Sequence, residues 1–517
     1  MPKCKGFPVN SRKIVSASGA IKHIKDGSTI CTGGFVGLCH PEILTSEIEK
    51  TFISEGRPKN LTVVYAAGQG DGKEKGINHL AHEGLVKRVI GGHWGLAPKM
   101  TKLAVENKIE AYNFPQGVIS HLYRDIASKK PGTITHVGLD TFVDPRVSGG
   151  ILNKKTTEKM VEIIELNDRE WLFYKAFSID VALIRGTSAD VDGNISMEKE
   201  AALLEMLAMA QAARNSGGIV IAQVERIVAK GSLNPWMVKV PGILVDYIVI
   251  AGDGDQWQTF GEKYNPSFSG EIKIPLDFIP KLSLNERKII CRRALAEIKE
   301  NMVVNLGIGL PEGISMVANE EEMLDLMKIT VECGVTGGIP ASGLSFGASY
   351  NPECIIDQPA QFDFYDGGGL DIAFLGMAQA DKQGNVNVSR FGDKIAGCGG
   401  FIDISQNTKK VVFCSTFTSG RLEISIDKGK LKITREGKHK KFVESVEQIT
   451  FSGNYAFRNK QVVLYITERA VFELKDGKVV LAEIAPGMDI KKDIFSQMDF
   501  EPVISKHLKP MDESIFC

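Results

Sequence analysis

Short apolar runs alternate with helical patterns along most of the chain. Residues 203–213 carry apolar side chains at helical spacing, and the β-branched run at residues 218–224 follows them. Strands that alternate with helices in this way are typical of parallel sheets covered by helices. The pattern therefore predicts an α/β protein.

The chain repeats this pattern at a long period. Residues 29–43 and 303–314 each contain an apolar strand, a glycine turn and a Pro-Glu pair that opens a helix. A second strand follows each pair, at residues 61–65 and 329–333. Residues 180–196 also align without gaps with residues 371–387, and both contain an Asp-x-x-Gly-Asn turn. Such turns are common by chance, but the echoes occur in the same order in both halves.

The repeat predicts two related open α/β domains, residues 1–280 and 281–517. The segment between them, residues 252–284, is rich in Gly, Asp, Pro and aromatic residues. A chain of 517 residues is long enough for both domains to have a core of their own. Because ligand sites often lie at domain interfaces, we expect the active site between the two domains.

One acidic residue breaks the apolar pattern of the second half. Glu332 ends the β-branched strand at residues 329–333 and precedes a turn with Gly334, Gly337 and Gly338. The aligned residue of the first half is Val64. An ionised side chain loses its hydration in a buried strand, and open α/β sheets bind ligands at the carboxyl ends of their strands. Glu332 is therefore our main site candidate.

Two interpretations of Glu332 remain open from the residues alone. The carboxylate could accept backbone N–H groups of the glycine turn as a structural cap. Alternatively, it could act as a base or nucleophile. With an ordinary pKa of about 4.3, it would be ionised at neutral pH and could attack an acyl carbon without a general base. In this second interpretation, the three glycines leave room for a large ligand.

Other candidate residues are weaker. His79 and His82 could share a helix face, but no third ligand has metal spacing, so we interpret them as a structural pair and predict no metal. Cys333 has no adjacent histidine and is interpreted as a packing residue. The glycine clusters at residues 367–369 and 397–400 are either tight turns or backbone donors for an anion.

Composition excludes several classes of partner. Lys and Arg total 62 against 63 Asp and Glu, and no basic run is interleaved with aromatics, so no nucleic-acid partner is expected. No phosphate loop or complete dinucleotide fingerprint occurs. The apolar runs are strand-sized and the first residues contain no apolar signal segment, so no membrane anchor is expected. Nine scattered cysteines without a CxxC pair favour reduced thiols and a cytoplasmic protein.

A set of ordered motifs resembles family I coenzyme A transferases. Two of them are Val-Glu-Cys-Gly at residues 331–334 and Ala-Gly-Cys-Gly-Gly-Phe-Ile-Asp at residues 396–403. The N-terminal half contributes Asn-Phe-Pro-Gln-Gly at residues 113–117. The resemblance covers nearly the whole chain and is greatest to propionate/acetate CoA-transferases of broad short-chain specificity. More distant ketoacid members have Ser-Glu-Asn-Gly around the glutamate, which argues against ketoacid specificity here.

The resemblance implies a reaction and its residues. Glu332 would be the nucleophile that forms a glutamyl-CoA thioester during ping-pong transfer of CoA between a short-chain acyl-CoA and a carboxylic acid. Gln116 would donate a hydrogen bond to the oxyanion, and the backbone at Gly397, Gly399 and Gly400 would supply the other donor and bind CoA. CoA would be substrate and covalent intermediate, without a permanently bound cofactor. We also expect a homo-oligomer, a dimer or tetramer.

Two rival functions use the same residues differently. An acyl-CoA hydrolase would use the same glutamate but admit water, and a non-catalytic CoA- or sugar-phosphate-binding protein would use only the fold. The preferred acyl group stays open, because one methylene changes binding by only about 1–3 kcal/mol.

Overall fold

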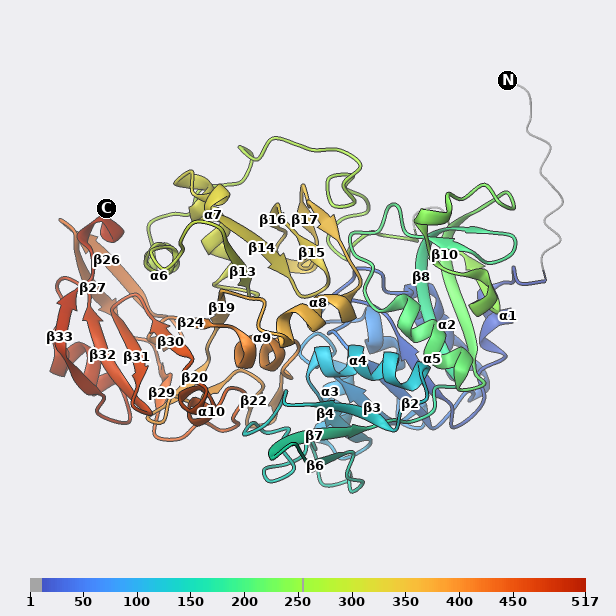
Figure 1. Ribbon diagram of the computed structural model, residues 1–517, viewed down its shortest axis with the longest axis horizontal. Helices are drawn as coiled ribbons and strands as arrows, with labels where there is room; N and C mark the ends of the chain where they lie inside the picture. The colour runs from blue at the N-terminus through green and yellow to red at the C-terminus, as the bar shows by residue number, and fades with distance from the viewer. Residues whose placement is uncertain (1–11, 253–254) are drawn as a thin grey trace.

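The computed structural model describes residues 12–252 and 255–517. Two large sheets lie side by side along the long axis of the molecule (Figure 1). Residues 1–11, which include Cys4 and the start of the segment examined for a targeting signal, lie outside the described residues, as do residues 253–254 of the predicted interdomain segment. The predicted boundary at residue 280 falls between the last strand of one sheet and the first strand of the other.

The first sheet has a parallel core with helices packed around it. Its order is β4-β3-β2-β1-β8-β10-β12, and the short strands β9 and β11 continue the edge of β8. The strands are β1 (Thr29–Thr32), β2 (Leu61–Tyr65), β3 (Val86–Gly91), β4 (Glu110–Asn113), β8 (Val181–Asp190), β9 (Ile195–Ser196), β10 (Ile219–Val228), β11 (Val238–Val240) and β12 (Tyr247–Ile250). The helices are α1 (Ala17–Ile21), α2 (Glu42–Glu55), α3 (Pro98–Val105), α4 (Gln116–Ala127) and α5 (Met206–Asn215).

The second sheet has a parallel core in the order β14-β13-β19-β24-β30, extended at both edges. The core strands are β13 (Met302–Leu306), β14 (Met327–Val331), β19 (Ile372–Gly376), β24 (Lys410–Cys414) and β30 (Val462–Ile466). The edge strands are β15 (Val335–Thr336), β18 (Cys354–Ile355), β31 (Ala470–Lys475), β32 (Lys478–Ile484) and β33 (Val503–Pro510). The helices are α6 (Glu286–Leu295), α7 (Glu312–Glu320), α8 (Gln358–Asp366), α9 (Phe401–Asn407) and α10 (Gly453–Arg458).

The two sheets confirm the predicted repeat. The strand order β14-β13-β19-β24-β30 of the second sheet matches β2-β1-β8-β10-β12 of the first. The aligned turns also form the same hydrogen bonds. Asp190 accepts from the backbone and side-chain nitrogens of Asn194, and Asp381 accepts from those of Asn385. Both halves are therefore α/β units of one topology.

Strand pairing changes the predicted alignment of the second strands. β1 pairs Cys31 with Val64, and β13 pairs Asn305 with Thr330. Cys31 and Asn305 both lie two residues before the glycine turn that ends their strand. Val64 is therefore the counterpart of Thr330.

The counterpart of Glu332 is Ala66 and not Val64, so the predicted alignment was wrong by two residues. A shift of two residues along a strand keeps every side chain on the same face. The apolar pattern is therefore almost the same in both alignments, and only the hydrogen-bonding register distinguishes them.

Helices from both halves meet between the sheets. α4 of the first half packs against α8 and α9 of the second (Figure 1). Phe362 of α8 is fully buried there, and a Cβ atom at Gly117 of α4 would lie 2.6 Å from its ring. One hydrophobic cluster contains residues of both halves, such as Val118 and Ile402. The two halves therefore share a continuous core.

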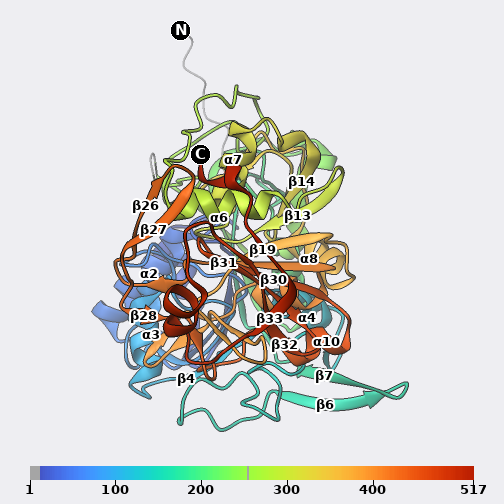
Figure 2. The ribbon, with the colours of Figure 1, turned by 90° about the vertical axis from the view of Figure 1, so that its left-hand side faces the viewer.

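A third, small antiparallel sheet projects from the first half (Figure 2). It consists of β5 (Gly132–Thr135), β6 (Val161–Leu166) and β7 (Arg169–Lys175). In the described part of the chain, no helix is both long and apolar enough to cross a membrane. All eight cysteines of that part are free thiols.

We expect Phe362→Ala to lower the free energy of unfolding by about 3–5 kcal/mol, because it leaves a cavity where α4, α8 and α9 meet. Urea denaturation followed by circular dichroism measures the loss. Phe364→Ala is the matched control, since Phe364 lies on the same helix but is 44% exposed and should cost much less. Equal losses for the two variants would contradict this view of the interface.

Candidate active site

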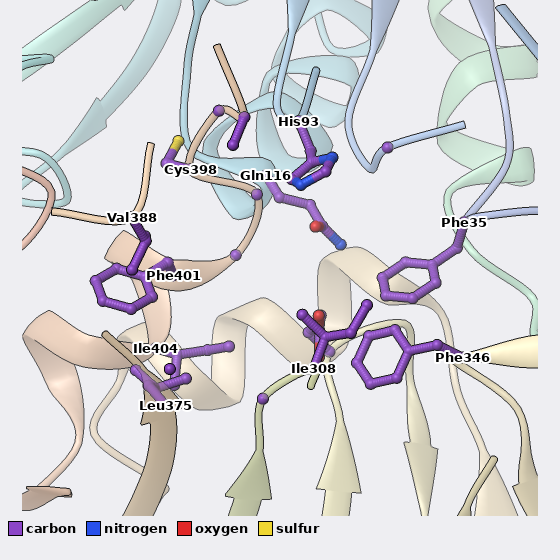
Figure 3. Close-up of a pocket in the computed structure, with 18 of the residues that line it drawn as sticks. Phe35, His93, Gln116, Ile308, Phe346, Leu375, Val388, Cys398, Phe401 and Ile404 are labelled. Carbon is purple, nitrogen blue, oxygen red and sulfur yellow. The ribbon is translucent and has the colours of Figure 1, made fainter. Parts of the chain in front are cut away.

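A cavity of about 210 Å³ lies at the carboxyl ends of β13, β14 and β19, where the two halves meet. The strand order reverses at this position, which is where open α/β sheets bind ligands. Figure 3 shows Gln116 extending into the cavity, with apolar side chains around it. These include Phe35, Phe346, Leu375, Val388, Phe401 and Ile404.

Glu332 lines this cavity directly after the last residue of β14. Its side chain is buried, and Oε2 has no hydrogen-bond partner among the described residues. Burial raises the pKa of Glu332 from 4.5 to about 7, although its own backbone N–H and the amide of Asn305 act in the opposite direction. The sequence-based expectation of an ordinary pKa was therefore wrong, because it did not include desolvation.

The glycines after Glu332 serve the protein's own packing. A Cβ atom at Gly334 would lie 2.0 Å from the carbonyl oxygen of Ile356, and one at Gly338 would lie 1.9 Å from that of Tyr350. A Cβ atom at Gly337 would lie 2.5 Å from Cγ of Glu353. All three have a positive φ, which favours glycine. None of the three lines the cavity that holds Glu332, so the expectation that they leave room there for a large ligand was wrong. The thiol of Cys333 is buried and donates to a backbone carbonyl at 3.0 Å, as a packing residue would.

Gln116 enters the cavity from the first half of the chain. It is the first residue of α4 and is 2% exposed. Its backbone N–H donates to the carbonyl oxygen of Gly399 at 2.9 Å, and its side-chain Nε2 donates to Oε1 of Gln358 at 3.1 Å. Both partners belong to the second half, so the structure brings Gln116 and Glu332 to one cavity.

The glycine loop at residues 397–400 also lines the cavity, but its amides differ. Gly397 donates its N–H to the carbonyl of Ser389 at 3.0 Å, and Gly399 donates to the carbonyl of Gly92 at 2.8 Å. The N–H of Gly400 donates to no residue that the structure describes. A Cβ atom at Gly400 would lie 3.5 Å from Cγ of Glu332. Of these three glycines, Gly400 is therefore the one that lies beside Glu332 with an N–H that has no acceptor among the described residues.

His93 is a cavity residue that the sequence did not reveal. Its ring lines the cavity beside Gln116 (Figure 3), and its Nδ1 has no hydrogen-bond partner among the described residues. Burial lowers the pKa of His93 to about 4, so the imidazole is neutral at pH 7. Like Glu332, His93 is a polar residue that follows a strand end, here after Gly91 and Gly92. That position was the signal that could have identified it.

Other sequence candidates lie elsewhere. Nε2 of His79 is hydrogen-bonded to Oε1 of Glu42 at 2.9 Å, and Nε2 of His82 to Oε1 of Glu49 at 2.7 Å. Both glutamates belong to α2, and these bonds are what a structural pair of histidines would form. The glycine cluster at residues 367–369 follows the end of α8 and does not line the cavity. Within residues 12–252 and 255–517, no group of three or more His, Cys, Asp or Glu side chains is placed to hold a metal ion.

Similarity to known proteins identifies the family of this protein. The family model described as Coenzyme A transferase matches residues 14–251. The chain is 50% identical over 510 residues to the caffeate CoA-transferase of Acetobacterium woodii, covering 98% of this chain and 97% of that protein. It is 45% identical over 511 residues to the acetate CoA-transferase YdiF of Escherichia coli (strain K12), covering 98% and 96%. The chain belongs to the coenzyme A transferase family.

The fold of this coenzyme A transferase agrees with a solved relative. The acyl-CoA transferase YdiF of E. coli O157:H7, in a thioester complex with CoA, superposes with a TM-score of 0.93 and 44% identity, covering 98% of this chain and 96% of that one. The CoA-transferase fold inferred from the motifs is thereby confirmed.

We expect Glu332→Gln to stabilise this coenzyme A transferase at pH 8. Because the folded-state pKa of about 7 lies above the ordinary 4.5, wild-type stability falls as pH rises between these values. The variant avoids this loss, so its gain should be about 3 kcal/mol at pH 8 and vanish below about pH 4.5. Urea denaturation at pH 5 and pH 8 measures the difference.

The exposed Glu322 provides the control, as Glu322→Gln removes a carboxyl group from the same half without changing a buried site. A pH-dependent gain of the same size in both variants would show that burial of Glu332 is not its cause.

Proposed function

We propose that this coenzyme A transferase moves CoA between a short-chain acyl-CoA and a carboxylic acid of the acetate or propionate type, in short-chain fatty acid metabolism. One observation carries the proposal. The carboxyl group of Glu332 lies in an apolar cavity together with the amide side chain of Gln116 and the available N–H of Gly400. A nucleophile beside two hydrogen-bond donors is the arrangement that acyl transfer requires.

In the first half-reaction, an oxygen of Glu332 attacks the thioester carbonyl of the donor acyl-CoA. The C–S bond breaks, so an acyl-glutamyl anhydride and the CoA thiolate form. The thiolate then attacks the glutamyl carbonyl carbon, and the donor acid leaves as a carboxylate. CoA remains on Glu332 as a thioester.

In the second half-reaction, the acceptor carboxylate reverses these steps and leaves as its acyl-CoA. The donor acid departs before the acceptor binds, so the kinetics are ping-pong. One thioester replaces another, and therefore the transfer needs no separate energy source such as ATP. The relative YdiF has been crystallised as a thioester complex with CoA, which supports a covalent CoA intermediate here.

Each attack passes through a tetrahedral oxyanion. We assign its stabilisation to Gln116 and to the N–H of Gly400, because Gly397 and Gly399 already donate to carbonyl oxygens of the protein. Fixed donors in a water-poor cavity cost no reorganisation during the reaction. Removal of one such donor typically lowers the rate by about 10²–10³.

The apolar walls favour transfer over hydrolysis. Phe35, Phe346 and Phe401 surround the reacting groups, and exclusion of water protects the anhydride and the thioester from hydrolysis. The same exclusion raises the pKa of Glu332 to about 7. The carboxylate that attacks is therefore poorly solvated and more basic than an exposed one.

Exposed apolar side chains support the expected homo-oligomer, and the cysteines support the expected cytoplasmic location. Trp236 and Ile243 are 88% and 81% exposed, and large apolar side chains in such positions support a contact between copies in a homo-oligomer. The free thiols among the described residues support a reducing, cytoplasmic location.

Acetyl-CoA should label Glu332 with CoA. After incubation and digestion, we expect the mass of CoA on the peptide that contains Glu332, measured by mass spectrometry. Glu332→Ala should abolish both the label and CoA transfer while the far-UV circular dichroism spectrum stays unchanged.

Cys333→Ala is the matched control for this label. It removes the neighbouring nucleophile and should keep the CoA adduct. A label that disappears with Cys333, or full transfer activity in Glu332→Ala, would overturn the assignment of the nucleophile.

A second substrate class is favoured by a specific observation. The relative of Acetobacterium woodii at 50% identity is a caffeate CoA-transferase. Phe35 and Phe346 lie with ring centroids 5.7 Å apart on one wall of the cavity, where an aromatic acyl group could stack. Transfer of CoA to an aromatic propenoic acid such as caffeate is therefore the alternative.

Initial rates with acetyl-CoA and a panel of acceptors distinguish these functions. We expect a higher kcat/KM with propionate and butyrate than with caffeate, and little CoA release when no acceptor is present. The highest kcat/KM with caffeate would replace the short-chain proposal by the aromatic one. CoA release at the rate of transfer would identify a hydrolase instead.

A further inference from the structure

The amide of Gln116 is one end of a buried hydrogen-bond chain. Its Nε2 donates to Oε1 of Gln358 at 3.1 Å. Nε2 of Gln358 donates at 2.8 Å to Oγ of Ser120 and at 2.8 Å to Oε2 of Glu205. None of the four side chains is more than 2% exposed. Bulk water therefore does not reach these hydrogen bonds, and the polar atoms depend on one another for hydrogen-bond partners.

Three separate segments of the protein hold the residues of this hydrogen-bond chain in place. Gln116 and Ser120 lie one turn apart on the same face of α4. Gln358 is the first residue of α8, and its backbone N–H donates to the carbonyl of Leu204 at 3.0 Å. Glu205 is the next residue and precedes α5. Gln358 of the second half is therefore fixed by both its backbone and its side chain against the first half.

The hydrogen bonds of this network run in one donor-to-acceptor direction, and this direction determines how the amide of Gln116 is oriented. An amide side chain has one accepting end and one donating end. Ser120 and Glu205 both accept from the nitrogen of Gln358, so its oxygen faces Gln116. Gln116 donates to this oxygen through one N–H of its side-chain nitrogen. The second N–H of the same nitrogen is not used by this bond.

We propose that Gln358, oriented by Glu205 and Ser120, is a positioning residue that holds the amide of Gln116 ready to donate to the oxyanion. The inference rests on the proposed role of Gln116 in acyl transfer. Gln358 does not line the cavity, so it acts through Gln116 and touches neither substrate nor reacting atoms. Because Gln358 belongs to the other half, the oxyanion donor is correctly oriented only when the two halves are docked.

Gln358→Met tests the role of the accepting oxygen. The side chains are similar in volume, but methionine offers Gln116 no comparable acceptor. We expect kcat for CoA transfer to fall by about tenfold, in line with the loss of one amide hydrogen bond, while KM changes much less. Wild-type kcat in this variant would overturn the proposal.

A double-mutant cycle shows whether Gln358 acts through Gln116. Gln116→Ala alone should lower kcat by about 10²–10³. Adding Gln358→Met to Gln116→Ala should cause no further loss, since the group that Gln358 positions is then absent. Losses that multiply would show that Gln358 acts independently and would overturn the proposal. Wild-type kcat in Gln116→Ala would instead contradict the proposed role of Gln116.

A conservative exchange provides the rescue. In the double variant Glu205→Gln/Gln358→Glu, the carboxyl group introduced at position 358 accepts from Gln116 and from the amide introduced at position 205. The direction of the chain is kept, so kcat should return to within about threefold of wild type. A kcat as low as that of Gln358→Met would contradict the direction assigned here.

Gln406→Met is the matched control. Gln406 is another buried amide that joins the halves, with Nε2 donating to the carbonyl of Leu139 at 2.8 Å and Oε1 accepting from the N–H of Gly138 at 2.7 Å. Its side-chain hydrogen bonds among the described residues do not involve Gln116, and it does not line the cavity. Gln406→Met should lower the thermal midpoint of unfolding but keep kcat. A tenfold loss of kcat in Gln406→Met would show that any buried amide between the halves has this effect, and would overturn the positioning role of Gln358.

Discussion

Desolvation of the Glu332 carboxyl group is the interaction on which the proposed active site depends. The side chain follows a buried parallel strand and enters a cavity with mostly apolar walls, where Oε2 has no partner among the described residues. Removal from water raises its pKa to about 7 and makes ionisation costly. The packed strands and interdomain helices hold it there. The same loss of solvent strengthens every hydrogen bond that a reacting oxygen can receive in the cavity.

The repeated architecture explains why two halves are needed. Each half places glycine turns and polar side chains at the carboxyl ends of its parallel strands, and these ends face one another. Reciprocal backbone bonds, from Gln116 to Gly399 and from Gly399 to Gly92, join the two sets of loops. Gly397, Cys398 and Gly399 all donate their N–H groups, and Gly400 is the loop residue whose N–H has no acceptor among the described residues. The site is thus a property of the docked halves and of neither half alone.

Local patterns were sufficient to predict the repeat and its turns. The Asp-x-x-Gly-Asn turn forms through bonds within five residues, and therefore the sequence shows it directly. Long-range register was not visible in the same way. Val64 was aligned with Glu332, although strand pairing makes Ala66 the counterpart, because strands of period two look alike after a shift of two residues. The glycines after Glu332 were misread for a similar reason, since their close neighbours are distant in sequence.

The sequence by itself determined the α/β class, the repeat, the family and the carboxylate at residue 332, because these depend on local pattern and ordered motifs. Only the tertiary structure decided the pKa of Glu332, the loop glycine whose amide has no acceptor among the described residues and the hydrogen-bond partner of the Gln116 side chain. Each of these depends on burial or on hydrogen-bond partners from distant segments. Gln116 and Gln358 are 242 residues apart in the chain, and only the docked fold brings their amides within 3.1 Å.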